Sequence, residues 1–494
     1  MKKHLLPLAL ILLSLLLAFS LLTLDHEWGD DWASYLMQAG AVTKGDAQGF
    51  IERNTFTMRE STHFIGPDAY PWGYPTLLAP FTLVCGPLNI LCLKIINPIL
   101  FALFLWVFYA LLARRLAPLE SALIVAVFAF SPLLLKFTDQ IGSDIAFLFF
   151  STLCLLLIVG RTLAPHASAG DAIPPYLLGL ALFFAFFIRT NGILLLPTLF
   201  CAQAFHYLQA TPRVFPDLKR ILTNEAIPYL VFGLLTVLNL ILFPAGEGSH
   251  LAHLSQISLD SLGDNLTAYF AMPAFFFSDL PYPEIIYGLL LPFILGGIIL
   301  NFKQDFPLIA YLIFSYALFI LWPEQQGIRF LFPLLPLLVY FAYRGMDAAR
   351  FALTDAYPRL GLWLARGFWL VIAVSFAWTS LGLARNNLAQ GRGPYGNAFD
   401  PLSIEMFEFI KSDTPVDAVV SFYKPRALRL FTDRASLLID TCDGLTLADY
   451  MVLRKSRGDV DQISPEKIEA CNVSVALTEI FSNKKFVVYQ ISPK

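Results

Sequence analysis

The chain has 494 residues, of which 57% are hydrophobic and only 14% are charged, and its formal net charge is −3. Soluble domains carry about a quarter charged residues, so this composition excludes an ordinary soluble protein and indicates a polytopic membrane protein. The slightly negative charge argues against a nucleic-acid partner. The six cysteines show no CxxC spacing that would suggest a zinc or redox site, and Cys442 and Cys471 could form a disulfide or remain free thiols.

The apolar segments predict about 11 transmembrane helices. The first, Leu5–Leu24, is predicted to be a retained signal anchor, because it is longer than a usual signal-peptide core and no A-x-A cleavage site follows it. The segment Tyr74–Val84 is apolar but short and bracketed by prolines, so it is predicted to be an interfacial or re-entrant helix. The ten further spans cover residues 88–112, 119–137, 143–160, 174–188, 193–210, 226–243, 284–300, 306–322, 328–343 and 363–384.

The basic residues of the connecting loops then fall on the same side of the membrane as Lys2 and Lys3, which is the asymmetry expected of a cytoplasmic face. The amino terminus is therefore predicted to be cytoplasmic. The opposite face receives two outer loops, residues 25–87 and 245–283, and the polar tail. The basic residues concerned are Arg114, Arg115, Arg161, Arg213, Lys219, Arg220, Lys303, Arg344, Arg350, Arg359 and Arg366.

The chain divides into a transmembrane domain, residues 1–385, and a small extracytoplasmic α/β domain, residues 395–494. About 100 residues can bury a core of their own, so the tail is predicted to be a soluble domain rather than a linker. We expect it to act as a packing cap on the membrane domain rather than to carry catalysis. Its predicted elements are helices over Pro401–Lys411 and Leu447–Arg457 and strands over Ala418–Tyr423 and Phe486–Ile491.

Asp30 and Asp31 begin the first outer loop, directly after an apolar segment. A carboxylate at a membrane rim is costly to desolvate without a partner, so the pair needs a purpose. Their side chains cannot point the same way on a helix or an extended strand. One is expected to face a cleft as a chemical group, while the other caps the helix that begins near Trp32.

Three further charged residues fall on the same face. Asp144 is either a helix cap or a second functional acid. Arg189 and Arg329 either extend toward lipid headgroups or bind a phosphate, which guanidinium groups suit well.

Histidines in the outer loops offer a weaker signal. His250 and His253 have the spacing of a metal pair, but a third ligand is not obvious, so solvated loop histidines are the preferred interpretation over a metal site. His63 is interpreted in the same way, and Asp30-Asp31 falls short of a D-x-D metal motif.

The order of these motifs resembles the GT-C class of polytopic membrane glycosyltransferases, in particular the bacterial relatives of dolichyl-phosphate-mannose protein mannosyltransferases and the lipid A aminoarabinose transferases. The resemblance extends over roughly residues 1–345, and the tail is similar to the extracytoplasmic domains that some members append. The two first-loop aspartates depart from the family's usual Asp-Glu pair, which leaves open which of them matches the catalytic acid. The motifs, in chain order, are Asp30-Asp31-x-x-x-Tyr35, Gly45-Asp46, Tyr70-Pro71-Trp72-Gly73-Tyr74-Pro75, Ser143-Asp144, Arg189-Thr190-Asn191-Gly192 and Arg329 ahead of Pro333-x-x-Pro336.

The resemblance implies an enzyme of the bacterial inner membrane that moves a hexose or pentose from a polyprenyl-phosphate donor to a hydroxyl of a lipid or glycan on the periplasmic face. Asp30 or Asp31 would be the general base, and Asp144 would help to position a substrate. Arg329, with Arg189, would hold the lipid phosphate. No cofactor is expected, although a divalent cation is left as an alternative. The candidate residues of the substrate cleft are Tyr35, Tyr70, Trp72, Tyr74, His250 and Tyr269.

The main alternatives are a lipid-linked glycan flippase, an oligosaccharide polymerase and a non-catalytic scaffold. A transporter usually places ionisable residues within its helices and shows repeat symmetry, whereas here the charges gather at helix ends and no internal repeat is seen. Glycosyl transfer instead requires a carboxylate near the sugar and cations near the departing phosphate, which is the combination found in these loops.

Overall fold

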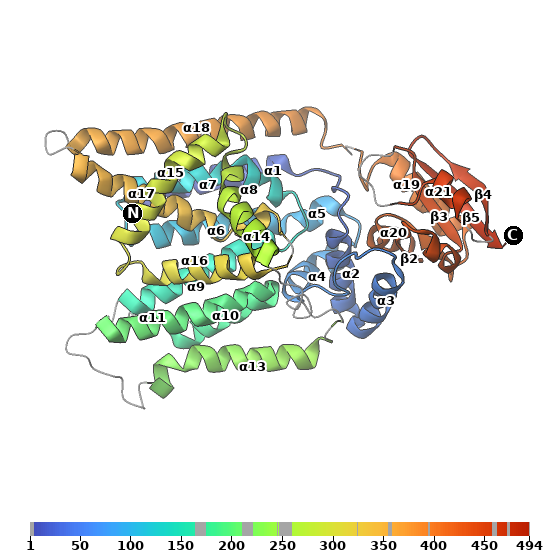
Figure 1. The fold of residues 1–494 in the computed structure, drawn as a ribbon, viewed down its shortest axis with the longest axis horizontal. Coiled ribbons are helices and arrows are strands. Elements are labelled where there is room, and N and C mark those ends of the chain that lie inside the picture. Colours follow the sequence, from blue (N-terminus) through green and yellow to red (C-terminus); the bar gives the residue numbers. More distant parts are fainter. Residues whose placement is uncertain are drawn as a thin grey trace.

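The computed structural model describes residues 4–163, 174–209, 221–244, 246, 259–323, 325–353, 358–393, 396–456, 462–471 and 475–493. Most of the described chain forms a bundle of apolar helices, and a smaller domain with a β-sheet lies at one end of it (Figure 1). The bundle contains α1 (Leu5–Leu21), α5 (Ile90–Lys94), α6 (Ile96–Leu112), α7 (Pro118–Ala129), α8 (Pro132–Thr138), α9 (Asp144–Leu163), α10 (Pro175–Ile188), α11 (Leu195–Gln209), α13 (Ile227–Leu242), α14 (Leu259–Ala271), α15 (Pro283–Leu300), α16 (Phe306–Leu321), α17 (Leu335–Leu353) and α18 (Pro358–Ala389).

A helix coincides with each of the eleven apolar spans predicted from the sequence. Among the described residues, four helices are long and apolar enough to cross a membrane, or five if the bent pair α7 and α8 forms one span. Other apolar helices, including α1, α10, α13 and α16, are shorter than this criterion. The predicted class, a helical polytopic membrane protein with a small C-terminal α/β domain, is confirmed.

Three helices between α1 and α5 form the segment predicted to be the first outer loop, which we call the first outer segment: α2 (Asp31–Lys44), α3 (Ala47–Glu60) and α4 (Gly73–Cys85). Helix α4 corresponds to the short apolar segment predicted to lie at the interface, and it contains the internal proline Pro80. It packs closely on α10, because a side chain at Gly73 would meet the backbone of Phe187 at 2.5 Å. The aromatic-proline motif therefore anchors the outer segment to the bundle.

The two ends of the bundle differ in what covers them. At the end marked N in Figure 1, Arg115 donates a 2.7 Å hydrogen bond from Nε to Asp305, and the Tyr340 hydroxyl donates to the same carboxylate. His4 lies at this end too, with its Nδ1 3.1 Å from the Tyr109 hydroxyl. We call it the basic end. The domain marked C lies at the opposite end, together with α2, α3 and α4.

Helices α15 and α17 meet along a seam of two glycines. A side chain at Gly297 would collide with the carbonyl of Phe341, and one at Gly345 would collide with the carbonyl of Phe293. Only glycine lets the two backbones approach so closely, which is a common device for packing helices in membranes.

The C-terminal domain, which we call the tail, is built on a five-stranded sheet in the order β2-β1-β3-β5-β4. The strands β2, β1 and β3 are parallel, whereas β5 pairs with β3 and β4 in antiparallel register. Its elements are α19 (Pro401–Asp413), β1 (Val419–Ser421), α20 (Pro425–Thr432), β2 (Ala435–Leu437), β3 (Tyr450–Arg454), α21 (Pro465–Ala470), β4 (Val475–Ser482) and β5 (Phe486–Pro493).

The prediction of a helix over Leu447–Arg457 is wrong, because this region contains the strand β3. Strand β3 lies between β1 and β5, and Tyr450, Met451, Val452 and Leu453 are all buried. A strand covered on both faces shows no alternation of apolar and polar residues, so its sequence cannot be told from that of a buried helix. The predicted helix at Pro401 and the strands near Val419 and Phe486 are confirmed.

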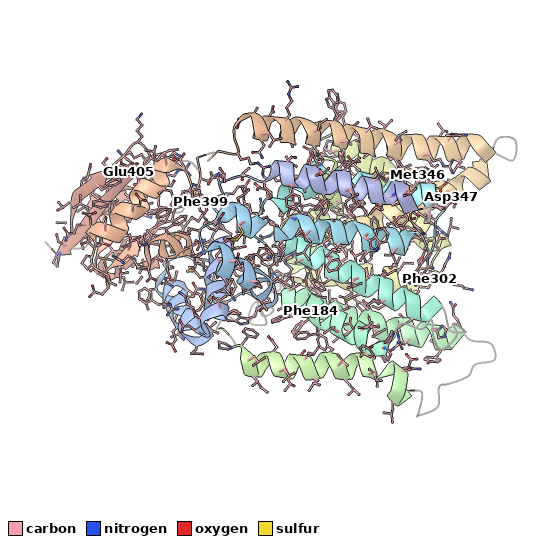
Figure 2. The ribbon with its side chains drawn as sticks, turned by 180° about the vertical axis from the view of Figure 1, so that it is seen from behind. Phe184, Phe302, Met346, Asp347, Phe399 and Glu405 are labelled. Atoms are coloured by element: carbon pink, nitrogen blue, oxygen red, sulfur yellow. A yellow bond between two sulfur atoms is a disulfide. The ribbon has the colours of Figure 1, made fainter. Side chains whose placement is uncertain are left out.

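Aromatic side chains join the tail to the first outer loop. Trp28 enters the tail core, with its ring centroid 5.4 Å from that of Tyr423 and 5.8 Å from that of Phe422. The ring centroid of Trp32 lies 5.8 Å from that of Phe399, which Figure 2 shows at the junction between the tail and the bundle. Burying such large rings fixes the orientation of the tail relative to the bundle.

Candidate active site

The two adjacent aspartates of the first outer loop point to different partners. Asp30 immediately precedes α2, yet its side chain makes no capping bond to that helix. It turns instead to the tail, where it accepts hydrogen bonds from the backbone N–H groups of Arg426 (3.1 Å) and Ala427 (3.2 Å), at the start of α20. Burial raises the pKa of Asp30, although the nearby charges of Arg426 and Lys424 oppose this shift. The prediction that one aspartate caps the helix beginning near Trp32 was wrong for Asp30, which instead caps α20, almost 400 residues further along the chain.

Asp31, the first residue of α2, faces the opposite way. Its Oδ1 accepts a 2.6 Å hydrogen bond from the Tyr70 hydroxyl, and its Oδ2 lies 3.4 Å from both terminal nitrogens of Arg329. Arg329 is in the short 3-10 helix Ile328–Leu331 that precedes α17. The two side chains keep 36% and 41% of their surfaces exposed, so this ion pair is long and open to solvent.

A second acid–guanidinium pair lies deeper. Asp144 begins α9, and its Oδ1 is 2.8 Å from Arg189 Nη2; the exposed fractions of the two side chains are 6% and 12%. Arg189 also donates from Nε to the Ser143 hydroxyl at 3.0 Å, which in turn lies 3.1 Å from the Tyr35 hydroxyl. Arg189 and Arg329 both lie near the Phe330 ring, at 4.8 and 5.5 Å from its centroid. The two pairs are therefore neighbours, and the inner one is shielded from solvent.

A cavity of about 440 Å³ opens between the bundle and the tail. Its wall includes Asp31, Arg329 and Asp144 from the bundle side, and Tyr423 and Lys424 from the tail. The tail thus forms part of the wall as well as packing on the membrane domain. Cavities of this size hold small-molecule ligands in many proteins. The other lining residues are His26, Glu27, Trp28, Gly29, Asp30, Trp32, Tyr35, His63, Phe64, Ile65, Gln140, Ile141, Gly142 and Leu438.

The predicted cleft residues of the first outer segment differ in how they lie relative to this cavity. Tyr35 lines it, and Tyr70 reaches it through the hydrogen bond to Asp31. Tyr74 is buried, donates to Asn97 and accepts from the Gly142 N–H group. Trp72 packs away from the cavity: its Nε1 donates to the Pro244 carbonyl, and its ring stacks on Phe243.

Of the two predicted cleft residues in later segments, Tyr269 does not line the cavity and His250 is not described. Tyr269, on α14, is buried, and its hydroxyl accepts a 2.7 Å hydrogen bond from the Gln326 N–H group. His250 and His253 lie outside the described residues. Among the residues that are described, no group of three or more His, Cys, Asp or Glu side chains is arranged to hold a metal ion.

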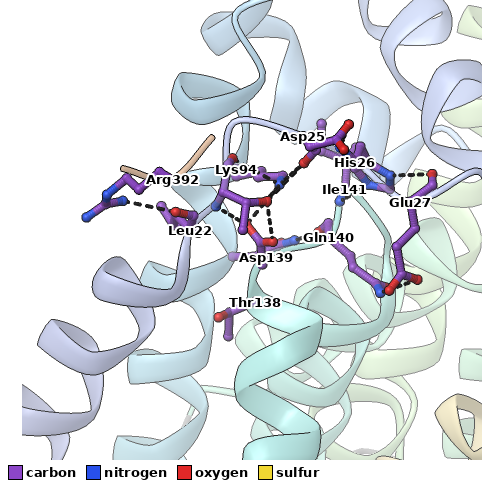
Figure 3. Close-up of polar contacts among 12 residues, drawn as sticks. Leu22, Asp25, His26, Glu27, Lys94, Thr138, Asp139, Gln140, Ile141 and Arg392 are labelled. Carbon is purple, nitrogen blue, oxygen red and sulfur yellow. Dashed lines mark hydrogen bonds and ion pairs between the residues drawn. The ribbon is translucent and has the colours of Figure 1, made fainter. Parts of the chain in front are cut away.

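Beside the cavity, a cluster around Lys94 ties the outer loops together (Figure 3). The Lys94 side chain is fully buried, and its Nζ donates to the Asp25 carbonyl, to the Thr23 carbonyl and hydroxyl, and to Asp139 at 2.8 Å. Asp139 also accepts from the backbone and hydroxyl of Thr23. Every donor of this ammonium group is used, so we assign the cluster a structural role. We call it the Lys94 cluster.

His26 extends this support to the edge of the cavity. Its Nε2 accepts a 3.0 Å hydrogen bond from the Ile141 N–H group, which requires the neutral ring with its proton on Nδ1, directed at the Glu27 carbonyl. Burial, followed by the charge of Lys94, lowers the pKa of His26 to about 3. The loop that carries Asp144 is thus held by a neutral histidine.

Sequence reasoning missed Arg426, Tyr423 and Lys424, because they lie in the tail, far along the chain from Asp30 and Asp31. It had also left both aspartates open as the catalytic acid. Both line the cavity, but the structure distinguishes them: Asp30 keeps only 9% of its side chain exposed and binds the tail, whereas Asp31 keeps 36% exposed and lies beside Arg329.

No protein-family model matches the chain, and no curated protein matches it in sequence. Solved structures do match its fold. ArnT from Cupriavidus metallidurans in the apo state is similar with a TM-score of 0.57 and 13% identity, covering 98% of this chain and 97% of that one. The same protein bound to undecaprenyl phosphate is similar with a TM-score of 0.56 and 12% identity over 98% and 97% of the two chains.

An oligosaccharyltransferase from Archaeoglobus fulgidus in the apo form is also similar, with a TM-score of 0.60 and 11% identity, covering 92% of this chain and 70% of that one. Because these matches cover 92–98% of this chain, they extend over both the helical bundle and the tail. The chain therefore has the fold of the GT-C membrane glycosyltransferases.

Proposed function

We propose that this protein is a membrane glycosyltransferase that moves a sugar from a polyprenyl-phosphate donor to an acceptor hydroxyl, with Asp31 as the general base. The observation that carries the proposal is the open Asp31–Arg329 pair in a cavity of about 440 Å³ at the end of an apolar bundle. The fold adds support, since the similar ArnT was solved with undecaprenyl phosphate, a lipid phosphate of the proposed class.

In this mechanism Asp31 accepts the proton of the acceptor hydroxyl as its oxygen forms a bond to the anomeric carbon of the sugar. The bond between that carbon and the donor phosphate breaks, and its electron pair leaves with the prenyl phosphate. Negative charge therefore grows on the phosphate oxygens, where the guanidinium of Arg329 would stabilise it. Arg329 has five N–H donors, and only its two terminal nitrogens approach Asp31, at 3.4 Å, so donors remain for a phosphate.

The inner pair has a different part in this proposal. The charge of Arg189 is already compensated by Asp144 at 2.8 Å in a shielded position. We therefore assign Arg189 to holding Asp144 and Ser143 in place, and Arg329 to the phosphate. Lys424 of the tail supplies a further cation to the cavity wall.

We also propose that the cavity faces the extracytoplasmic side of a bacterial inner membrane. Arg115 and Arg344 lie together at the basic end, where Arg344 Nη1 donates to the Arg115 carbonyl, and cytoplasmic loops are enriched in arginine and lysine. The cavity and the tail lie at the other end. In the tail, Cys442 and Cys471 are joined as a disulfide, which fits an oxidising compartment.

The test is the release of prenyl phosphate from a polyprenyl-phosphate sugar by the purified protein in vesicles with an acceptor lipid. Wild type should release it, and Asp31→Asn should lower turnover by about 10²–10⁴, the usual contribution of a general base. Asp46→Asn is the matched control, because Asp46 pairs with Arg53 on the exposed surface of the same outer segment.

The amount of prenyl phosphate released on the outside of the vesicles should also rise with the fraction of molecules whose tail an added protease can cut. The reason is that the tail and the cavity lie at the same end of the bundle. A flippase would move the donor without releasing prenyl phosphate. Wild-type turnover in Asp31→Asn would reject the assigned base.

A further inference from the structure

The tail places one buried cation within reach of the proposed base. Arg426 is the second residue of α20, and its side chain is fully buried at the junction between the tail and the first outer segment. Its backbone N–H binds Asp30, and its Nε lies 4.0 Å from Asp30 Oδ2. Burying an arginine is costly unless its donors are used, so the partners of this side chain show what it does there.

Those partners lie in the loop before α4. Nη2 donates to the Pro67 carbonyl, and Nη1 donates to the Tyr70 hydroxyl at 3.4 Å. The guanidinium carbon lies 5.7 Å from the centroid of the Tyr70 ring. Gly66 has a φ of +101°, and a side chain there would come within 3.2 Å of the Tyr70 hydroxyl and 3.4 Å of Arg426 Nη1. The loop is therefore shaped to bring these two side chains together.

The hydrogen bonds between Arg426, Tyr70 and Asp31 can run in only one direction. Arginine can donate but cannot accept, so the Tyr70 oxygen must be the acceptor toward Arg426. The single proton of the hydroxyl then points to Asp31, 2.6 Å away. Burial, together with the charge of Asp31, raises the pKa of Tyr70 well above its ordinary value, so this proton is retained.

We propose that Arg426 is a positioning residue for catalysis, through which the tail orients the Tyr70 hydroxyl toward Asp31. This inference rests on the proposed role of Asp31 as the base. Tyr70 holds Oδ1, so Oδ2 is left toward Arg329 and the cavity. A cation at the far side of the hydroxyl also polarises it and strengthens its donation to the carboxylate. The tail thus acts on the base as well as covering it.

Loss of either link should change how the reaction depends on pH. A hydrogen bond to an ionised carboxylate favours the ionised form, and the base must be ionised to act. Tyr70→Phe removes the hydroxyl, and Arg426→Gln removes the cation that orients it. The acid limb of the kcat/KM profile should therefore move to higher pH in both variants, and activity on that limb should fall about fivefold to tenfold, the value of one hydrogen bond of about 1 kcal/mol or slightly more.

The experiment is a double-mutant cycle of Tyr70→Phe and Arg426→Gln, with kcat/KM followed against pH in the prenyl phosphate assay. We expect Arg426→Gln to have no further effect on the acid limb once Tyr70 is Phe, because its action passes through the hydroxyl. Arg429→Gln is the matched control. Arg429 is also buried on α20, but its Nη1 donates to the Arg53 carbonyl, so its loss should lower the melting temperature without moving the limb.

An unmoved acid limb in folded Arg426→Gln, or full additivity of the two changes, overturns the inference. If Arg426→Gln does not fold, Tyr70→Phe decides alone, since an unmoved limb there removes the link. Failure of the proposed function is recognised separately, because Asp31→Asn would then keep its turnover.

Discussion

The Lys94 cluster and the Asp31–Arg329 pair lie at the same end of the bundle, but one is closed by its own hydrogen bonds and the other faces a cavity. Lys94 is fully buried, its Nζ lies 2.8 Å from Asp139, and three further acceptors surround it. Asp31 and Arg329 stand 3.4 Å apart with more than a third of each side chain exposed. Charges of the first kind hold a structure together, whereas charges of the second kind retain donors and acceptors for a substrate.

The largest expected effect on stability comes from breaking the closed cluster. Lys94→Met leaves the Asp139 carboxylate without its cation, and removing one partner of a buried ion pair typically costs about 3–5 kcal/mol. The melting temperature of the purified protein should fall steeply. The double variant Lys94→Met/Asp139→Asn should recover part of the loss, because the unpaired charge is gone. Equal stability of Lys94→Met and wild type would show that the cluster is not structural.

The open pair should respond in activity instead. Arg329→Gln removes the cation assigned to the leaving phosphate, and loss of one such donor commonly lowers kcat by about 10²–10³. Its melting temperature should stay close to that of wild type, because an exposed ion pair contributes little to stability. Arg329→Lys keeps the charge but loses the planar arrangement of donors, so its kcat should lie between those of Arg329→Gln and wild type. A lowered melting temperature with wild-type turnover in Arg329→Gln would show that the open pair serves stability rather than activity.

The smallest of the three effects concerns pH. His26 has a pKa of about 3 in the folded chain against an ordinary value of 6.5, so the unfolded chain binds more protons between these values. Stability is therefore lost as the pH falls below 6.5, by about 2 kcal/mol at pH 5. Melting temperatures at pH 7.5 and pH 5 should show the loss. In His26→Asn the acid-dependent loss should be smaller by this amount, and an unchanged slope would contradict the assignment.

Much of the fold could be predicted because long apolar runs report membrane helices directly. Each predicted span holds a helix, and the proline-bracketed segment near Tyr74 forms the short helix α4. The strand β3 was missed because it is buried on both faces, which removes the alternation that marks a strand. Local pattern was thus enough for the bundle and for α19, β1 and β5 of the tail, but not for β3.

The candidate site could be predicted only in part, for a related reason. Acids and arginines at helix ends stand out against an apolar sequence, and Asp31, Asp144, Arg189 and Arg329, singled out in this way, do lie close together in the structure. The choice between Asp30 and Asp31 depends on a contact with Arg426, 396 residues away from Asp30, and no local pattern reports such a contact. The same distance along the chain hid the tail's share of the cavity wall.

The glycine seam between α15 and α17 also matters for Arg329. At Gly297 and Gly345 the two helices have no room for even a methyl group, so the separation of their axes is set by backbone contact alone. Arg329 precedes α17 by a few residues, so its position depends on where α15 holds α17. Two residues without a side chain thereby help to position one of the longest side chains of the bundle. An alanine at either glycine would push α17 away from α15 and shift the Arg329 guanidinium without contacting it.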